Sequence, residues 1–273
     1  MTQTYETLRV ERQGAVAEVV LARPQAGNAL NAQTFADLEA AFAALDVDPE
    51  VRVAILRAEG KAFCYGLDLM AAPVDFAPVL TEGLAGERLE LRALVRQLQR
   101  QTAAPARFRR PVVAAIHGWC IGGGLDLAAA CDLRLCAADA RFSLREARVG
   151  MVADLGSLQR LPRIMGDAAT RELAFTAKDI DAARAERLGL VSEVCATLDD
   201  LLAAARREAA AIAALSPLVT AGLKHVLAAQ DGRTVEEGLE YVATWNSAFL
   251  QSEDLREAFA SFLEKRPPAY RGR

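Results

Sequence analysis

Along the first half of the chain, short apolar runs alternate with stretches of helical periodicity. The apolar runs have the length of strands and occupy residues 5–12, 15–21, 51–58, 111–116, 131–137 and 141–144. The first two are joined by Gln13-Gly14, which predicts a hairpin. A helix capped by Asn31 or Thr34 is predicted between the second and third runs. Strands that alternate with helices predict an α/β protein with a parallel or mixed sheet.

From about residue 168 the periodicity becomes helical and stays so to the end. The helical segments cover residues 169–175, 181–189, 199–214, 216–229, 234–251 and 253–266. The last two are strongly amphipathic and could pack on a neighbouring subunit or close over their own core. An earlier amphipathic helix is predicted over 86–102, after a flexible loop or lid at 71–86. We therefore expect a core of residues 1–199 and a C-terminal helical region of residues 200–273.

Composition limits the classes of function. The chain is 52% hydrophobic and 25% charged, which is typical of a soluble globular enzyme. Its 273 residues allow one large domain, or one domain with a small appendage. A net charge of −4 without a long basic run gives no reason to expect nucleic-acid binding. No apolar run reaches membrane-spanning length, so no membrane association is expected. The N-terminal segment lacks the apolar core of a signal peptide, and the final RGR differs from the peroxisomal tripeptide, so we expect a cytoplasmic protein.

Metal binding is not expected either. The five cysteines lack C-x-x-C spacing, and the two histidines, His117 and His225, are far apart in the sequence. Reduced and mostly buried thiols fit this pattern best. We expect His117 to be a structural residue at the end of a strand, and His225 to be unrelated to the chemistry. Tyr241 and Trp245 share a helical face and are expected to pack in the core or against a subunit.

Residues 111–126 stand out because a buried strand, a glycine triplet and a helix follow one another directly. Gly122, Gly123 and Gly124 lack a Cβ, so bare backbone can approach a ligand at this turn. The free N–H groups at the start of the following helix favour an anion or an oxygen that acquires negative charge. The spacing matches neither the dinucleotide fingerprint nor the P-loop. A tight turn in which Asp126 serves only the helix dipole stays as an alternative.

A second glycine-containing loop, FCYGLD at 63–68, also follows a buried strand. Two such loops can each offer one N–H to a single oxygen, which is the design of an oxyanion hole. Three acids lie in unusual surroundings: Asp126 in an apolar helix, Glu146 after the strand RFSLR, and Asp154 within GMVADLG. Glu146 could instead be a solvated acid, and Asp154 could cap a helix that starts at Leu155. Together with the two loops, the acids predict proton transfer beside a stabilised oxyanion.

Several motifs resemble those of the crotonase (enoyl-CoA hydratase/isomerase) superfamily. They are RPQAGNALN, KAFCYGLDL, PVVAAIHGWCIGGGLDLAAACDLRLC, LGSLQRLPRIMG and AERLGLVSEV. The resemblance implies an α/β spiral of ββα turns, with a C-terminal helical region that forms homotrimers, often assembled into homohexamers. It also implies acyl-CoA thioesters as substrates in fatty acid β-oxidation, with CoA as part of the substrate and no further cofactor. By position, the N–H groups of Leu67 and Gly123 are expected to form the oxyanion hole. The implied substrate-binding residues are Tyr65, Gly66, Leu67, Asp68, Leu69 and Gly123.

The acids distinguish the reactions within the superfamily. The trio Asp126, Glu146 and Asp154 resembles the dienoyl-CoA isomerases, which shift a 3,5-dienoyl-CoA to its 2,4 isomer. We expect Glu146 to serve C2 and a protonated Asp154 to serve C6, while Asp126 holds and tunes them. An enoyl-CoA hydratase is the alternative, in which Asp126 and Glu146 position one water. A crotonase-fold protein that only binds a partner is a remote third possibility.

Overall fold

A seven-stranded mixed sheet organises the computed structural model, which describes residues 2–76 and 83–273. Its strands, in spatial order, are β1 (Thr2–Thr4), β2 (Leu8–Gln13), β3 (Val16–Leu21), β4 (Val53–Ala58), β5 (Val112–Ile116), β7 (Leu133–Ala137) and β10 (Glu193–Cys195). The first three pair antiparallel, and β2 and β3 form the predicted hairpin. From β3 to β10 every pairing is parallel, so the carboxyl ends of these strands meet at one edge.

A small second sheet lies beside the central glycines. It contains β6 (Trp119–Ile121), β8 (Arg141–Ser143) and β9 (Ile180–Asp181). The sequence pattern did not predict β6, because a run of three residues between Gly118 and Gly122 is too short to show alternation. β6 pairs parallel with β8, and β8 pairs antiparallel with β9. This sheet therefore links the central turn to the strand that precedes Glu146.

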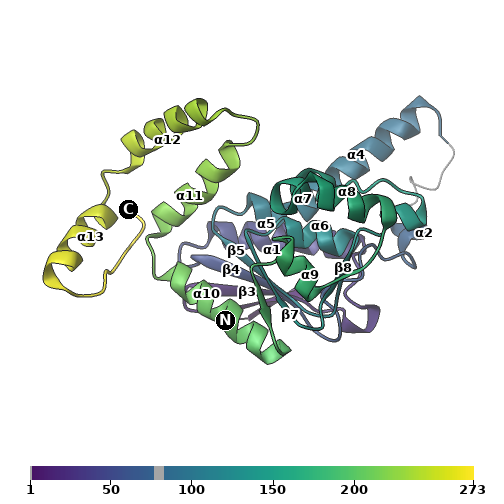
Figure 1. Cartoon of the computed structure of the whole chain (residues 1–273), viewed down its shortest axis with the longest axis horizontal. Helices are drawn as coiled ribbons and strands as arrows, with labels where there is room; N and C mark the ends of the chain where they lie inside the picture. The colour runs from purple at the N-terminus through teal and green to yellow at the C-terminus, as the bar shows by residue number, and fades with distance from the viewer. Residues whose placement is uncertain (1, 77–82) are drawn as a thin grey trace.

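Helices cover both faces of the main sheet (Figure 1). The helices of the described residues are α1 (Ala32–Val47), α2 (Ala72–Asp75), α4 (Ala85–Thr102), α5 (Ala104–Arg107), α6 (Gly123–Ala129), α7 (Ser157–Met165), α8 (Asp167–Thr176), α9 (Ala182–Arg187), α10 (Leu198–Ala213), α11 (Pro217–Ala229), α12 (Val235–Phe249) and α13 (Glu253–Glu264). Two 3₁₀ turns span Pro24–Ala26 and Glu146–Val149. Asn31 caps α1, because its side chain accepts the N–H of Thr34.

The strand residues alternate between two cores, as the pleat requires. On β4, Ala54 and Leu56 point to the larger core with α1 and α6, whereas Val53 and Ile55 point to a smaller core. The smaller core is completed by α10, through Leu201 and the alanines that follow it. The helix that begins at Leu198 is therefore packed on the sheet. The division at residue 200 stays a prediction.

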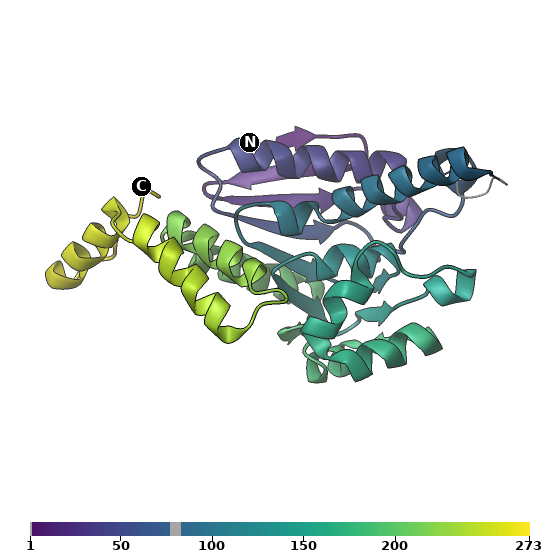
Figure 2. The ribbon, with the colours of Figure 1, turned by 90° about the horizontal axis from the view of Figure 1, so that it is seen from above.

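The last three helices, α11 to α13, extend away from the sheet (Figures 1 and 2). Lys224 on α11 joins them to the core: its Nζ donates to the carbonyls of Pro105 and Arg110 and pairs with Asp132 at 2.7 Å. Among the described residues, no single helix combines the length and hydropathy of a membrane span. Only α10 and α11 taken together do so, and they are bent by 105°.

The predicted loop at 71–86 is only partly a loop. Residues 72–75 form the short helix α2, and α4 already begins at Ala85. Residues 77–82 lie outside the described part of the chain. Asp75, at the end of α2, accepts the N–H of Ala32 through its Oδ2 at 3.0 Å. This contact connects the segment after the first glycine loop to the start of α1.

Candidate active site

Two glycine loops lie side by side at the centre of the site. Cys64 N donates to Trp119 O at 2.8 Å, and Ile121 N donates to Cys64 O at 3.1 Å. These bonds make Cys64 and Cys120 a parallel bridge between the loop after β4 and the strand β6. The predicted juxtaposition of residues 63–68 with the central turn is therefore confirmed.

Only glycine allows this approach at two positions. Gly66 has a φ of +85°, and a Cβ there would lie 2.8 Å from the carbonyl oxygen of Ile121 and 3.3 Å from Gly123 N. Gly122 has a φ of +53°, and a Cβ there would lie 3.2 Å from Oε1 of Glu146. Both residues adopt the left-handed backbone region that side chains disfavour.

Leu67 and Gly123 bring two unoccupied backbone N–H groups close together. A Cβ placed on Gly123 would lie 3.8 Å from Leu67 N. The neighbouring donors are occupied, since Gly122 N donates to Ser143 O and Asp68 N donates to Leu30 O. Within residues 2–76 and 83–273, neither Leu67 N nor Gly123 N has an acceptor. Two such donors suit an oxygen that acquires charge.

The other residues of the first glycine loop differ in their exposure and in their hydrogen bonds. Tyr65 is 45% exposed, and its ring lies over Gly27, where a Cβ would overlap it. Leu69 is exposed. The Asp68 carboxylate is paired with Arg23 at 2.9 Å and accepts the N–H groups of the two residues after Leu69. Desolvation would raise the pKa of Asp68, but the Arg23 and backbone hydrogen bonds lower it overall. Its side chain shapes the loop, and a role in substrate binding stays a prediction.

Asp126 is buried, and its carboxylate bridges two helices. It lies in the first turn of α6, and its Oδ1 accepts the N–H of Ser157, the first residue of α7, at 2.5 Å. Desolvation raises the pKa of Asp126 to about 7, and the negative charge of Glu146 acts in the same direction. The hydrogen bond from Ser157 and the charge of Arg160 oppose the shift. Asp126 therefore contacts the start of α7 in addition to lying in α6.

Glu146 lies at the start of the 3₁₀ turn after β8, with its carboxylate beside Gly122. Its Oε2 is buried and has no hydrogen-bond partner in the described residues. Burial raises the pKa of Glu146, and the charge of Asp154 raises it further. The alternative of a fully solvated acid is therefore wrong. A buried carboxylate oxygen without a partner suits a group that exchanges protons with a bound molecule.

Asp154 is near enough to Glu146 to influence its ionisation, although it is exposed in the isolated chain. Desolvation raises the pKa of Asp154. The alternative of a helix cap is wrong, because α7 begins at Ser157 and Gly156 precedes it. Asp126, not Asp154, meets the first N–H of that helix. The three acids are thus brought to the loop pair as a group linked by electrostatic interactions.

Residues that the sequence did not single out complete the surroundings. Gln99 on α4 donates from Nε2 to the carbonyl oxygen of Asp154 at 2.7 Å. Ser157 contributes a backbone N–H, which no side-chain pattern can reveal. Of the two histidines, His117 is buried and its Nε2 contacts Gly60 O at 3.0 Å, in agreement with a structural role. His225 stacks near Tyr241 and Trp245 on the C-terminal helices.

The cysteines are buried free thiols, as their spacing predicted. Burial raises the pKa of Cys64 and of Cys131 to about 12, which keeps both thiols protonated at neutral pH. Among the described residues, no group of three or more His, Cys, Asp or Glu side chains has the geometry of a metal site. The acids and the backbone donors are thus the reactive groups that the site offers.

Comparison with known proteins identifies the family. A family model described as enoyl-CoA hydratase/isomerase matches residues 11–273. The chain is 41% identical to the mitochondrial Delta(3,5)-Delta(2,4)-dienoyl-CoA isomerase of Dictyostelium discoideum, over 98% of this chain and 92% of that protein. It is also 41% identical to the peroxisomal protein of the same name from Arabidopsis thaliana, over 98% and 97%.

Solved structures agree with the fold. The enoyl-CoA hydratase of Bacillus anthracis superposes with a TM-score of 0.88 at 27% identity, and the alignment covers 98% of this chain and 100% of that one. The enoyl-CoA hydratase of Mycobacterium smegmatis gives a TM-score of 0.85 at 30% identity, over 97% and 98%. These matches confirm the predicted α/β fold class. The chain therefore belongs to the enoyl-CoA hydratase/isomerase family, the crotonase superfamily, and is an enzyme.

Proposed function

We propose that this enzyme isomerises a 3,5-dienoyl-CoA to the conjugated 2,4-dienoyl-CoA. The observation that carries the proposal is the meeting of three acids of raised pKa, Asp126, Glu146 and Asp154, beside two unoccupied backbone N–H groups. The names of the two relatives at 41% identity support the same reaction. An isomerase moves protons at two distant carbons, C2 and C6, and therefore needs an additional acid such as Asp154.

The first step depends on the backbone donors. Removal of a proton from C2 gives a dienolate whose negative charge falls on the thioester oxygen. The N–H groups of Leu67 and Gly123 are proposed to donate hydrogen bonds to that oxygen as an oxyanion hole. Loss of one such donor typically reduces the rate by about 10²–10³. The loop residues from Tyr65 to Leu69 are proposed to line the path of the CoA moiety.

The second step needs a different acid. C2 and C6 lie far apart along the acyl chain, so one carboxylate cannot easily serve both carbons. Glu146, with its buried unpartnered oxygen, is proposed to take the C2 proton, and Asp154 to deliver a proton to C6. Two interacting acids favour a state in which one is charged and the other protonated. Asp126 is proposed to hold the two acids in place and to tune their pKa values electrostatically.

An enoyl-CoA hydratase is the second candidate, and one observation favours it. The charge of Glu146 raises the pKa of Asp126 beside the same N–H pair, and two acids suffice to position a water for addition across C2 and C3. The solved structures compared above also carry that name. That reaction has no proton transfer for a third acid such as Asp154, so the isomerase is preferred.

The substrate class and surroundings follow from the sequence and the family. An acyl-CoA thioester is the proposed partner, with no cofactor beyond the CoA that it carries and no nucleic acid or membrane. A cytoplasmic location stays a proposal from the sequence, since the names of the two relatives place those proteins in mitochondria and peroxisomes. Fatty acid β-oxidation is the proposed setting.

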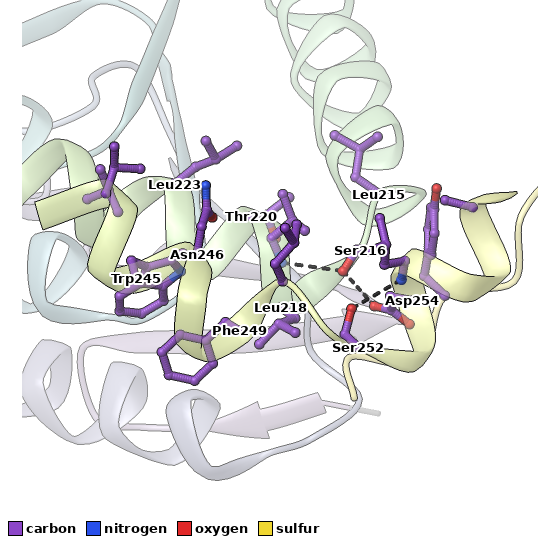
Figure 3. Close-up of a pocket in the computed structure, with 18 residues that line it drawn as sticks. Leu215, Ser216, Leu218, Thr220, Leu223, Trp245, Asn246, Phe249, Ser252 and Asp254 are labelled. Carbon is purple, nitrogen blue, oxygen red and sulfur yellow. Dashed lines mark hydrogen bonds between the residues drawn. The ribbon is translucent and has the colours of Figure 1, made fainter. Parts of the chain in front are cut away.

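A homotrimer or homohexamer is the proposed assembly. An apolar pocket of about 370 Å³ lies between α11, α12 and α13 (Figure 3). Leu223, Trp245 and Phe249 line it, and further apolar side chains on these helices are exposed in the isolated chain, including Leu227 and Phe262. Exposed apolar surface of this kind supports burial against copies of the same chain.

The test is an ultraviolet assay of the purified enzyme with 3,5-octadienoyl-CoA, run beside crotonyl-CoA. Growth of the conjugated 2,4-dienoyl absorbance, with crotonyl-CoA hardly hydrated, is the expected result. Rapid loss of the enoyl absorbance with an inert dienoyl substrate would establish the hydratase and refute the isomerase. Inactivity with both substrates would refute both candidates.

A further inference from the structure

The segment from Asp154 to Ser157 is held from three directions. Gln99 on α4 donates to the carbonyl of Asp154, and Arg160 Nη1 donates to the carbonyl of Leu155 at 3.4 Å. The N–H of Ser157 is bound by Asp126. The contacts from Asp126 and Arg160 come from α6 and α7. The contact from Gln99 comes from a different element, far away in sequence.

The side-chain amide of Gln99 makes a second hydrogen bond. Arg96, one helical turn earlier on α4, donates from Nη1 to Oε1 of Gln99 at 3.2 Å. This bond orients the amide so that Nε2 faces Asp154 O, at 2.7 Å. The amide thus bridges an arginine on its own helix and the backbone of a residue 55 positions away in the sequence.

The other supports of the segment leave room for movement at Asp154. Ala153 and Leu155 on either side are buried, which anchors the chain, while Asp154 between them is exposed. Gly156 follows with a φ of +128°, and the guanidinium of Arg160 fills the space where a Cβ would stand. The hydrogen bond from Gln99 acts on the carbonyl of Asp154 itself, two residues before this glycine.

We propose that Gln99 is a positioning residue for Asp154: its amide fixes the backbone of this acid and so aims the carboxyl at the distal end of the acyl chain. The inference rests on the proposed isomerase, because only there does Asp154 deliver a proton. Gln99 touches neither the substrate nor the reacting atoms in this role. It acts on the second proton transfer and leaves the first to Glu146.

That division gives a sharp kinetic test. In heavy water, Glu146 can exchange the proton that it takes from C2 for a deuteron of the solvent and return this deuteron to C2. Recovered substrate then carries deuterium, whereas product forms only when C6 is protonated. For Gln99→Ala and Gln99→Glu we expect isomerisation to fall by about 10- to 100-fold, while deuterium exchange at C2 changes by less than about twofold. Gln99→Glu keeps the side-chain length, but its ionised carboxylate cannot donate. Gln97→Ala, an exposed neighbour on the same helix, is the matched control.

A second readout does not depend on activity. Amide hydrogen exchange of residues 151–157, followed by mass spectrometry, is expected to be about tenfold faster in Gln99→Ala than in the wild type and in Gln97→Ala. The inference would be overturned if amide hydrogen exchange of residues 151–157 were unchanged in Gln99→Ala. It would also be overturned if deuterium exchange at C2 and isomerisation fell by the same factor. A wild-type enzyme without isomerase activity would instead refute the proposed function, and amide exchange would still decide whether Gln99 holds the segment.

Discussion

At the scale of single residues, the roles of Glu146 and Asp154 are separable. Glu146→Gln removes the base at C2, so we expect isomerisation and C2 exchange both to fall by about 10²–10⁴. Asp154→Asn removes only the acid at C6, so isomerisation is expected to fall by a similar factor while C2 exchange in heavy water continues. Nuclear magnetic resonance of the recovered substrate measures the exchange. Full isomerase activity in Asp154→Asn would refute its assignment.

The buried Asp126 is expected to reduce stability above neutral pH. Its folded-state pKa of about 7 lies above the ordinary value of about 3.9. Between these values the folded protein keeps a proton that the unfolded chain has lost, so the free energy of unfolding decreases as pH rises through this window. The full penalty is present above pH 7, and it vanishes below about pH 4, where both states are protonated. Asn cannot ionise but can still accept the N–H of Ser157.

Asp126→Asn is therefore expected to increase the free energy of unfolding at pH 8 by about 2–4 kcal/mol and to have a smaller effect at pH 5. Denaturant titration at fixed protein concentration measures it. The exposed Asp167→Asn, at the start of α8, is the control and should change the free energy by less than about 0.5 kcal/mol. Parallel pH curves for Asp126→Asn and the wild type would show that Asp126 does not carry a raised pKa.

At the scale of elements, the two glycine loops work only while their backbones touch. Gly66→Ala places a Cβ 2.8 Å from Ile121 O in a backbone of positive φ, so the loop must move and Leu67 N with it. We expect kcat to fall by about 10²–10³, as for the loss of one oxyanion donor. Gly14→Ala, which also has positive φ but open space around it, is the matched control and should keep its activity. Equal losses in both variants would mean that strain, not the loop contact, decides.

Sequence patterns predicted most of these elements, because hydrophobic periodicity and turn residues are local features of the chain. Buried strands, capped helices and glycine turns follow from local periodicity. The hairpin and the two loops were predicted correctly, and Asn31 was one of the two residues predicted as the cap of α1. Contacts made by backbone groups leave no such trace. The N–H of Ser157 at Asp126 and the carbonyl of Asp154 at Gln99 depend on how α4, α6 and α7 pack, so neither was predicted. The same packing made Asp154 precede the helix by three residues, where the sequence had suggested a cap.

At the scale of the whole molecule, helices α11 to α13 expose large apolar side chains that no other described part of the isolated chain covers. Leu227 on α11 and Phe262 on α13 are 70% and 80% exposed, on helices that project from the sheet (Figure 2). If these helices pack between copies of the chain, each side chain transfers apolar area out of water on assembly, worth about 1.5–3 kcal/mol when fully buried. A charge at either position would have to be desolvated at the same interface.

The double variant Leu227→Glu, Phe262→Glu is therefore expected to shift the protein from trimers or hexamers towards monomers. Size-exclusion chromatography with light scattering measures the mass at matched concentration. Val47→Glu adds a charge at an equally exposed apolar position, 78% exposed at the end of α1, and should leave the mass unchanged. A monomeric wild type, or an unchanged oligomer in the double variant, would show that α11 to α13 do not form an interface between copies of the chain. The apolar surface on α11 to α13 would then need another partner, because a patch of this composition is unfavourable in water.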